Sequence, residues 1–342
     1  MDAPERFLAA CARRPVDRTP VWMMRQAGRY LPEYRAIRER VDFLTLCKTP
    51  ELAAEVSLQP VERFGVDVCI IFSDILIPVE AMGIPISFGD SGPQLERSVR
   101  SRADVDVLRV PDPASTMPFV AETIRLCKRA LAGRAALLGF TGAPFTLAAY
   151  TIEGGGSKNF ASTKSLLYSD PQLCHALLDK LASATAEHAA AQIAAGAQAI
   201  QVFDTWAGEL EPAAYEEFAL PYHTRVIERI RSAGVPAILY VNGCAGVLEL
   251  MARSSADVLS VDWRITLSEA RARIGPSIAL QGNVDPAILL STPVRVAQAA
   301  FAALEAAGPA GHVLNLGHGI LPDTPVACAQ AFVDAPKVAT VS

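Results

Sequence analysis

The sequence lacks closely spaced cysteines, has few lysines and contains no long stretch of purely apolar residues. Its seven cysteines are odd in number and widely spaced, with no C-x-x-C pair, which is typical of a reduced intracellular protein and argues against a disulfide framework. One uncharged run, residues 135–152, includes glycines, a proline and three threonines, so we interpret it as a buried strand followed by a loop. The N-terminus mixes charges of both signs without an apolar segment. We therefore expect no signal peptide and a cytoplasmic location.

The excess of acidic over basic residues is small. With 31 lysines and arginines against 36 aspartates and glutamates, the net charge is −5, so we expect no general attraction to nucleic acid or to an anionic membrane. Any anionic ligand would need a local basic site. A composition of 51% apolar and 20% charged residues excludes disorder. Because no repeat, low-complexity tract or linker interrupts the 342 residues, we predict one catalytic domain over residues 1–342.

Short apolar segments of strand length alternate with helical patterns along the chain. Residues 171–196, for example, carry leucines near helical spacing and end in a glycine suited to a C-terminal cap. Parallel strands joined by helical crossovers are covered on both faces, and eight such units are what a closed barrel needs. We therefore predict the α/β class and a single (β/α)8 TIM barrel. The expected strands are residues 21–24, 68–72, 137–140, 199–203, 237–241, 258–261, 278–280 and 313–316.

One connection, between residues 72 and 137, is too long for a simple crossover. It contains two short segments, 84–88 and 95–100, on either side of the glycine-containing turn 89–93. This pattern is typical of two antiparallel strands joined by a turn. We predict a β-hairpin inserted after strand 2 of the barrel.

Polar residues follow almost every expected strand, at the end of the barrel where active sites lie. Arg25 and Arg29 follow the first strand. If that loop turns helically, they share a face and present two guanidinium groups to carboxylates or phosphates; the alternative is a pair of ordinary surface ion pairs. Asp74 ends an uninterrupted apolar segment, where a carboxylate needs either a cationic ligand or an internal salt bridge to one of these arginines.

Later strand ends carry more polar side chains. For three of them, Asp204, Asp262 and Asn283, two interpretations are open, because such residues either belong to a site or cap the helices that follow. The others are Thr205, Asn242, Gln281 and His318.

Four segments resemble the signature segments of one family. Residues 20–34 (PVWMMRQAGRYLPEY) closely resemble the N-terminal signature of the uroporphyrinogen decarboxylase family, and residues 139–150 (GFTGAPFTLAAY) its second diagnostic segment. Residues 72–76 (FSDIL) and 315–319 (NLGHG) match as well. The resemblance implies a cofactor-free carboxy-lyase of haem biosynthesis. Such an enzyme converts the four acetates of uroporphyrinogen III to methyl groups, giving coproporphyrinogen III, and works as a cytoplasmic homodimer.

The resemblance assigns roles to the first strand ends. Arg25 and Arg29 match carboxylate-binding arginines, which an acidic protein needs for a substrate with eight carboxylates. Asp74 matches the family's central aspartate, which would accept hydrogen bonds from four pyrrole N–H groups and stabilise positive charge on a protonated pyrrole. The protonated ring itself accepts the electrons left by carbon dioxide, so neither pyridoxal phosphate nor a lysine Schiff base is needed. Family arguments favour Arg25 as the proton donor, whereas a guanidinium with a pKa above 12 is a poor acid.

The remaining assignments come from the later motifs. Tyr150 matches a tyrosine that holds the aspartate or an acetate, and His318 a histidine near a side-chain carboxylate, so both join Asp74 and Arg25 as implied catalytic residues. Thr205 stands where family members carry a serine, and the adjacent Trp206 replaces the histidine of some relatives. Two aromatic residues are expected either to line the substrate pocket or to pack in the core: Phe203 and Tyr34.

Other classes of protein fit the sequence less well. Cobamide-dependent methyltransferases share the barrel and bind zinc through a His-x-Cys motif after strand five, where this sequence has Asn242 and Cys244; we expect no metal site. Glycines at 154–156 and 317–319 complete neither a Walker loop nor a dinucleotide fingerprint. A purely structural role would leave the polar strand ends unexplained. We expect a tetrapyrrole ligand, with no nucleic acid and no membrane.

Overall fold

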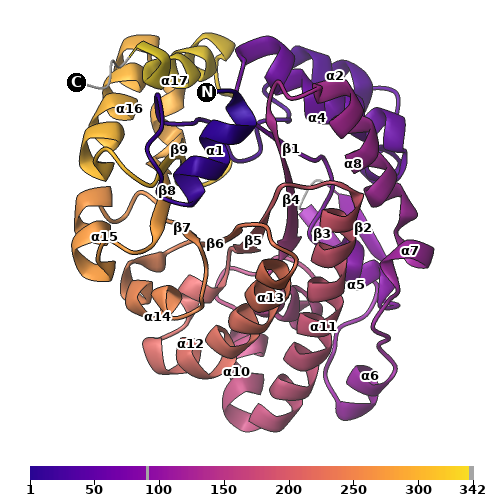
Figure 1. Cartoon of the computed structure of the whole chain (residues 1–342). Coiled ribbons are helices and arrows are strands. Elements are labelled where there is room, and N and C mark those ends of the chain that lie inside the picture. The colour runs from indigo at the N-terminus through magenta and orange to yellow at the C-terminus, as the bar shows by residue number, and fades with distance from the viewer. Residues whose placement is uncertain (90–91, 339–342) are drawn as a thin grey trace.

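The computed structural model describes residues 1–89 and 92–338, and its centre is a curled parallel sheet of seven strands (Figure 1). Neighbours in the sheet follow the order β1-β4-β5-β6-β7-β8-β9. Every residue of β1, β4 and β6 is buried, as expected for parallel strands covered on both faces. The strands are β1 Val68–Ile70, β4 Ala136–Gly142, β5 Ala199–Asp204, β6 Ala237–Val241, β7 Val258–Ser260, β8 Ala279–Val284 and β9 His312–Leu316.

The segment 20–22 lies between the two edge strands, β9 and β1. Leu314 of β9 donates its N–H to the Pro20 carbonyl at 2.9 Å, and the N–H of Asp67, just before β1, bonds to the Val21 carbonyl at 2.9 Å. The expected strand at 21–24 is nevertheless absent, and only an isolated bridge between Val21 and Leu314 forms. The reason is that the Met24 N–H bonds to a side-chain oxygen, Asn315 Oδ1, at 2.8 Å instead of to a strand backbone.

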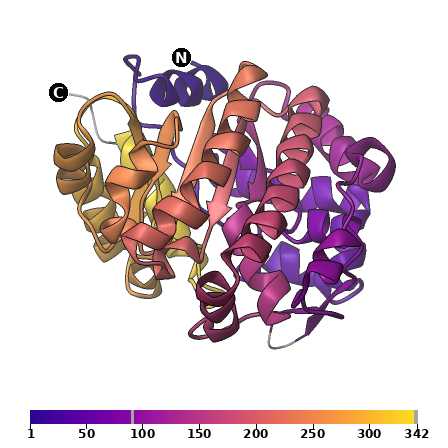
Figure 2. The ribbon, with the colours of Figure 1, turned by 90° about the horizontal axis from the view of Figure 1, so that it is seen from below.

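Helices surround the sheet on its outer face, as Figures 1 and 2 show. The longest, α11, begins where Asp170 accepts a hydrogen bond from the Leu173 N–H and ends at Gly196, as the sequence predicted. The helices are α1 Ala3–Cys11, α2 Pro32–Arg38, α3 Phe43–Lys48, α4 Pro50–Phe64, α5 Ile77–Ala81, α6 Arg102–Asp106, α7 Pro113–Thr116, α8 Pro118–Leu131, α9 Pro144–Glu153, α10 Ala161–Ser169, α11 Pro171–Ala195, α12 Pro212–Phe218, α13 Leu220–Ser232, α14 Leu248–Ala252, α15 Leu267–Ile274, α16 Pro293–Ala307 and α17 Val326–Val338. Short 3-10 helices are η1 Ala207–Glu209, η2 Cys244–Gly246 and η3 Pro286–Leu290.

Two short strands lie outside the main sheet. β2 Ile86–Gly89 and β3 Gly92–Leu95 follow β1 and pair antiparallel with each other. Two residues of the expected turn, Asp90 and Ser91, lie outside the described residues, and the second strand is Gly92–Leu95 instead of the expected 95–100. β3 is attached to the end of α9 through a hydrogen bond from the Leu95 N–H to the Gly154 carbonyl at 3.1 Å.

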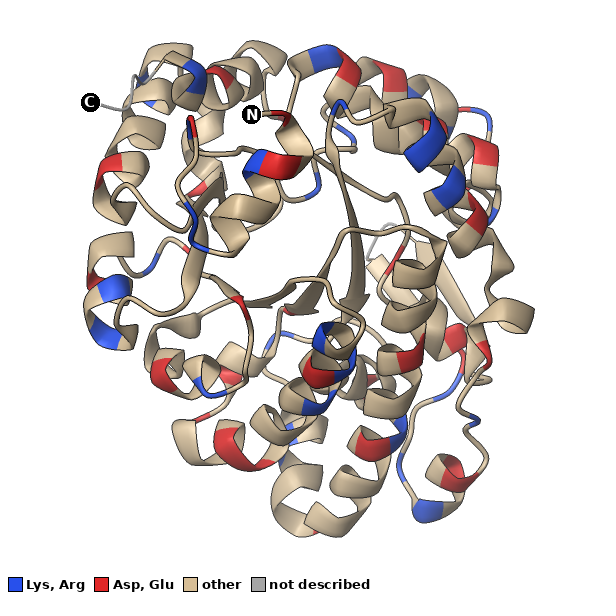
Figure 3. Ribbon diagram, in the orientation of Figure 1, with Lys and Arg blue, Asp and Glu red and all other residues tan. Residues whose placement is uncertain are grey.

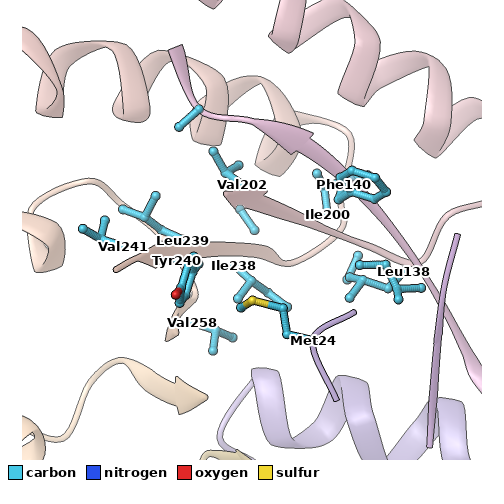
Figure 4. Close-up of a cluster of buried hydrophobic side chains, with 14 of the residues drawn as sticks. Met24, Leu138, Phe140, Ile200, Val202, Ile238, Leu239, Tyr240, Val241 and Val258 are labelled. Carbon is cyan, nitrogen blue, oxygen red and sulfur yellow. The ribbon is translucent and has the colours of Figure 1, made fainter. Parts of the chain in front are cut away.

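Apolar side chains gather in a buried cluster at the curled sheet, and the charges lie mainly on the helices around it. Figure 4 shows a cluster of buried side chains that includes Met24, Phe140, Val202 and Tyr240. Lysine, arginine, aspartate and glutamate residues of both signs are spread over the outer helices (Figure 3). Among the described helices, none combines the length and the apolar character needed to cross a lipid bilayer.

Candidate active site

The loop after segment 20–22 is held against two distant parts of the chain. Gln26 is fully buried and donates from Nε2 to the Val68 carbonyl of β1 at 2.9 Å. On the other side, the Ile320 N–H bonds to the Met24 carbonyl at 2.9 Å. The segments 20–34 and 315–319, nearly 300 residues apart in the chain, therefore meet at the end of the sheet. Between these anchors, Arg25 adopts the left-handed region with φ of 60°.

Arg25 lies directly over Gly319. A Cβ atom at Gly319 would stand only 2.3 Å from Arg25 Cδ and 2.9 Å from its Nε. The absence of a side chain at Gly319 thus provides the space in which the Arg25 side chain lies. The end of this side chain is exposed, so the guanidinium is available to a ligand.

Asp74 follows β1 and is partly exposed. Its Oδ1 accepts a hydrogen bond from the Leu76 N–H at 2.8 Å, and it forms no ion pair within 4 Å with any residue that the structure describes. Burial raises the pKa of Asp74 to about 6, against the opposing effects of the Leu76 N–H and the Arg25 charge. The structure therefore does not show an internal salt bridge from Asp74 to an arginine. This carboxylate is left available for an external donor or cation.

Tyr150 lies near Asp74 and Arg25, and His318 lies near Arg25. Tyr150, in the last turn of α9, has its ring 6.0 Å from the Trp206 ring; burial raises its pKa, and the charges of Asp74 and Arg25 act on it in opposite directions. The His318 ring stacks on Tyr240 at 6.0 Å. Burial, with smaller effects from positive charges including Arg25, lowers the pKa of His318 to about 4. His318 is thus neutral at pH 7, and its buried Nδ1 has no hydrogen-bond partner among the described residues.

The second arginine and one aromatic residue lie on the α2 side of the site. Arg29 is exposed, and its positive charge acts to lower the pKa of Tyr34, which burial raises. Tyr34 is buried with its ring 5.7 Å from that of Phe72, two residues before Asp74. Turns and bends, not a helix, connect Arg25 to Arg29. The two arginines therefore do not share a helical face.

The other two expected site residues come from the end of β5. Phe203 packs its ring 5.7 Å from Phe140 and 5.9 Å from Tyr240, so one edge of it belongs to the core. Thr205 is partly exposed. Thr205 directly follows Asp204, and the hydrogen bonds of Asp204 fix the turn that contains Thr205.

Three strand-end side chains have their polar atoms satisfied within the protein. Asp204 is buried, bonds to His223 Nε2 and Thr146 Oγ1 at 2.6 Å each, and caps η1. Asp262 accepts from the Gly243 N–H at 2.8 Å. Asn283 Nδ2 donates to the Asp262 and Ile265 carbonyls at 2.9 and 2.6 Å. Of the three, only Asp204 bonds to the first residue of a following helix, whereas Thr266 caps α15 and Asp285 caps η3.

Gln281 likewise belongs to the core. It lies within β8 and bonds to Trp22 Nε1 at 3.0 Å and to Gln201 and Ser260 at 2.9 Å each. All four side chains are fully buried. Gln281 therefore bridges β8 to β5 and β7 in the core and does not extend from the end of the sheet.

Sequence reasoning missed two arginines near the site. Arg38, on α2, lies with its guanidinium carbon 5.9 Å from the Phe43 ring and acts to lower the pKa of Tyr34. Arg264, just after β7, acts to lower the pKa of His318. Arg38 gave no strand-end signal because it lies on a helix. Arg264 could have been found, because it comes two residues after the strand-end Asp262.

The site joins one unpaired carboxylate, exposed arginine side chains, a neutral histidine and a tyrosine. Such a set can bind several carboxylates and stabilise a positive charge at its centre. Among residues 1–89 and 92–338, no group of three or more His, Cys, Asp and Glu side chains comes together as a metal site. Cys244 is buried with Sγ 3.6 Å from Asp262 Oδ1.

Comparisons with known proteins agree with each other on the family. A family model described as uroporphyrinogen decarboxylase (URO-D) matches residues 2–338. A uroporphyrinogen decarboxylase of Trichlorobacter lovleyi is 51% identical over 96% of this chain and 97% of its own length. One from Myxococcus xanthus is 50% identical over 97% and 95%. Among solved structures, a methyltransferase from Methanosarcina mazei superposes with a TM-score of 0.85, covering 98% of both chains at 24% identity, which is a likeness of fold alone.

Proposed function

The chain belongs to the uroporphyrinogen decarboxylase family, and on this basis we propose that its candidate site removes carbon dioxide from the four acetates of uroporphyrinogen III, giving coproporphyrinogen III in haem and tetrapyrrole biosynthesis. The observation that carries the site assignment is Asp74, a carboxylate without an ion-pair partner among the described residues, whose pKa burial raises to about 6. Such a group is stabilised by a ligand that offers several N–H donors or a positive charge.

The substrate's chemistry fits the two kinds of charge in the site. Four pyrrole N–H groups converge at the centre of the macrocycle, and a carboxylate such as Asp74 is an acceptor-only group for them. Eight carboxylates lie around the rim, where the exposed Arg25 and Arg29 offer bidentate guanidinium groups. The Arg25 side chain packs against Gly319, and this contact orients it for the acetate that reacts.

The reaction proceeds through a protonated pyrrole. A proton adds to the pyrrole α-carbon next to the ring carbon that carries the acetate, and the ring becomes cationic. The bond to the carboxylate carbon then breaks, carbon dioxide leaves, and the electron pair neutralises the ring. A second proton adds to the exocyclic carbon while the ring proton is lost, so each acetate consumes one proton and yields one methyl group.

Each implied catalytic residue has a part in this sequence. Ionised Asp74 stabilises the cationic ring through its charge. Arg25 holds the reacting acetate. Tyr150 lies beside Trp206, and the neighbouring Thr205 offers a hydroxyl to the reacting acetate. The neutral His318 has an unpaired Nδ1 that can bind a side-chain carboxylate. Tyr34 and Phe203 supply apolar wall.

Further properties belong to the same proposal. We infer a closed (β/α)8 TIM barrel as one domain over residues 1–342, supported by the hydrogen bonds of segment 20–22 to both sheet edges, with β2 and β3 as the inserted hairpin. The family resemblance supports a cytoplasmic homodimer that binds neither nucleic acid nor membranes. No cofactor is required, because the substrate's own ring accepts the electrons.

An anaerobic assay tests the function. Purified protein, dialysed against a chelator, is incubated with chemically reduced uroporphyrinogen III, and the oxidised products are separated by chromatography. We expect porphyrins with seven to four carboxylates to appear in turn, ending at the four-carboxylate product. Unchanged eight-carboxylate material would contradict the function. Activity that returns only with added zinc or pyridoxal phosphate would contradict the cofactor-free part alone.

A further inference from the structure

Arg264 is fixed between the ends of β6 and β7. Its Nη1 donates to Asn242 Oδ1 at 3.1 Å and also pairs with the Asp262 carboxylate. The guanidinium carbon lies 4.5 Å from the centre of the Trp263 ring, in cation–π contact. Asp262 is fully buried and itself held by the Gly243 N–H. The guanidinium is therefore oriented before any ligand arrives.

The other edge of this guanidinium remains free. The Arg264 side chain is 48% exposed. Within the part of the chain that the structure describes, its side-chain hydrogen bonds all come from Nη1, and Nε and Nη2 have no partner. Nε and Nη2 together form the edge of an arginine that binds a carboxylate with two parallel hydrogen bonds.

The turn that carries Arg264 packs against the loop that carries His318. A Cβ atom at Gly317 would stand 2.7 Å from the Trp263 backbone nitrogen, so the 263–264 turn lies directly against the glycine next to His318. The positive charge of Arg264 acts on His318 and also on Tyr240, whose ring stacks with His318. Arg264 is thus a third arginine at the end of the sheet, on the β7 side.

We propose that Arg264 is a carboxylate-binding residue at the β7 side of the pocket, where its Nε and Nη2 bind one side-chain carboxylate of the porphyrinogen that does not react in that step. This inference rests on the proposed function. Eight carboxylates surround the macrocycle, and Arg25 and Arg29 account for few of them. Because Asp262 balances its charge, Arg264 acts through the geometry of its two donors more than through long-range attraction.

The test compares Arg264→Gln with Arg253→Gln, a control that also removes an exposed, ion-paired arginine, since Arg253 pairs with Glu216 at the end of α14. Steady-state kinetics with uroporphyrinogen are measured for both. We expect Arg264→Gln to raise KM roughly ten-fold or more, as loss of a charge-assisted pair does, with kcat changed by less than about two-fold. Arg253→Gln should match the parent.

A second variant and a melting measurement distinguish loss of carboxylate binding from misfolding. Arg264→Lys keeps the positive charge but loses the two-donor edge, and we expect a smaller rise in KM, on the order of three- to ten-fold. Thermal melting followed by circular dichroism shows whether each variant is folded.

The outcomes separate the two proposals. If the parent releases carbon dioxide and both Arg264 variants keep the parent KM, the carboxylate-binding role is overturned while the function stands. A fall in kcat or in melting temperature without a rise in KM would assign Arg264 a structural role instead. A parent without activity overturns the proposed function itself.

Discussion

Asp74 illustrates how burial changes the pKa of one carboxyl group. Removing a carboxylate from water disfavours its ionised form, and a nearby cation offsets only part of that cost. Here the Leu76 N–H and the Arg25 charge act against burial, yet the pKa of Asp74 still rises to about 6. The ionised side chain is therefore less stable in the empty site than it would be beside several N–H donors. A ligand with several N–H groups would offset the cost of burying the ionised carboxylate, which favours a nitrogen-rich ligand at this position.

The pKa of Asp74 predicts the acid side of the pH profile. Below about pH 6 Asp74 is protonated and cannot balance a cationic ring, so kcat/KM should fall as pH decreases through this value. Asp74→Asn should lose nearly all turnover at every pH, because an amide adds N–H donors opposite the pyrroles and carries no charge. Rates between pH 5 and 8 provide the measurement. A folded Asp74→Asn protein with near-parent activity would disprove the role.

Gly319 allows a second test at the scale of single residues. In Gly319→Ala the new methyl group would overlap Arg25 Cγ and Cδ, at 2.8 and 2.3 Å, so the arginine must move. We expect kcat/KM to fall roughly ten-fold or more, since a charge-assisted contact is lost, while the melting temperature changes little. Gly246→Ala is the matched control, because nothing lies within 4 Å of its Cβ position. Equal activity of the two variants would mean that Arg25 is not fixed by Gly319.

At the scale of elements, a buried aspartate joins the N-terminal segments to β1. Asp67, 1% exposed, accepts hydrogen bonds from Arg6 of α1 at 2.9 Å and from Arg18 at 2.7 and 2.8 Å. It also accepts the Val21 N–H at 2.9 Å. Asp67 precedes β1, whereas Asp74 follows it, so this cluster lies at the opposite end of the sheet from the site. Its role is to hold segment 20–22 beside the sheet edge.

Removing this carboxylate should affect stability and not catalysis. Asp67→Ala removes an acceptor from the buried Arg6, both acceptor oxygens from the partly buried Arg18 and the acceptor of the Val21 N–H, and we expect the free energy of unfolding in urea to fall by about 3–5 kcal/mol. The kcat of the folded fraction should stay near that of the parent. Asp17→Ala, which removes the other, 44% exposed partner of Arg6, should cost under about 1 kcal/mol. Similar losses for the two variants would contradict the joining role of Asp67.

The expected elements agree with the structure where burial alone determines them. Seven of the eight expected strands lie in the main sheet, because continuous apolar segments need cover on both faces. The segment 21–24 fails as a strand because a side chain, Asn315, takes the place of a backbone partner, and hydrophobicity carries no such information. The same limit applies to Asp262 and Gln281, since a sequence pattern shows a polar residue near a strand end but not which atoms it bonds to.

The whole molecule contains five histidines, and burial lowers the pKa of three of them. His188 in α11 and His312 in β9 are 4% and 3% exposed. Burial lowers the pKa of each to about 4, as it does that of His318. These three lie in different parts of the chain, so their protonation affects the fold as a whole.

These histidines predict loss of stability in mild acid. In the unfolded chain they bind protons near pH 6.5, whereas in the folded protein they do so near pH 4, so between these values the unfolded state holds three more protons. Asp74 acts in the opposite direction. Its folded pKa of about 6 exceeds its unfolded value of 3.8, so at this residue the folded state holds one more proton than the unfolded state. The net difference of two protons means that the free energy of unfolding should fall by about 3 kcal/mol per pH unit as pH decreases near 5.

Urea denaturation at pH 7.0, 6.0, 5.5 and 5.0 measures that slope. The His188→Leu variant sharpens the test, since burial is the one cause of the lowered pKa of His188 and an apolar side chain of similar size suits such surroundings. Replacing it removes one of the protons bound on unfolding, so the slope near pH 5 should decrease by about 1.4 kcal/mol per pH unit. Asp74→Asn should change the slope in the opposite direction, because it removes the proton bound by the folded state. A flat stability profile from pH 7 to 5 in the parent would show that these histidines are accessible to water and protons in the folded protein.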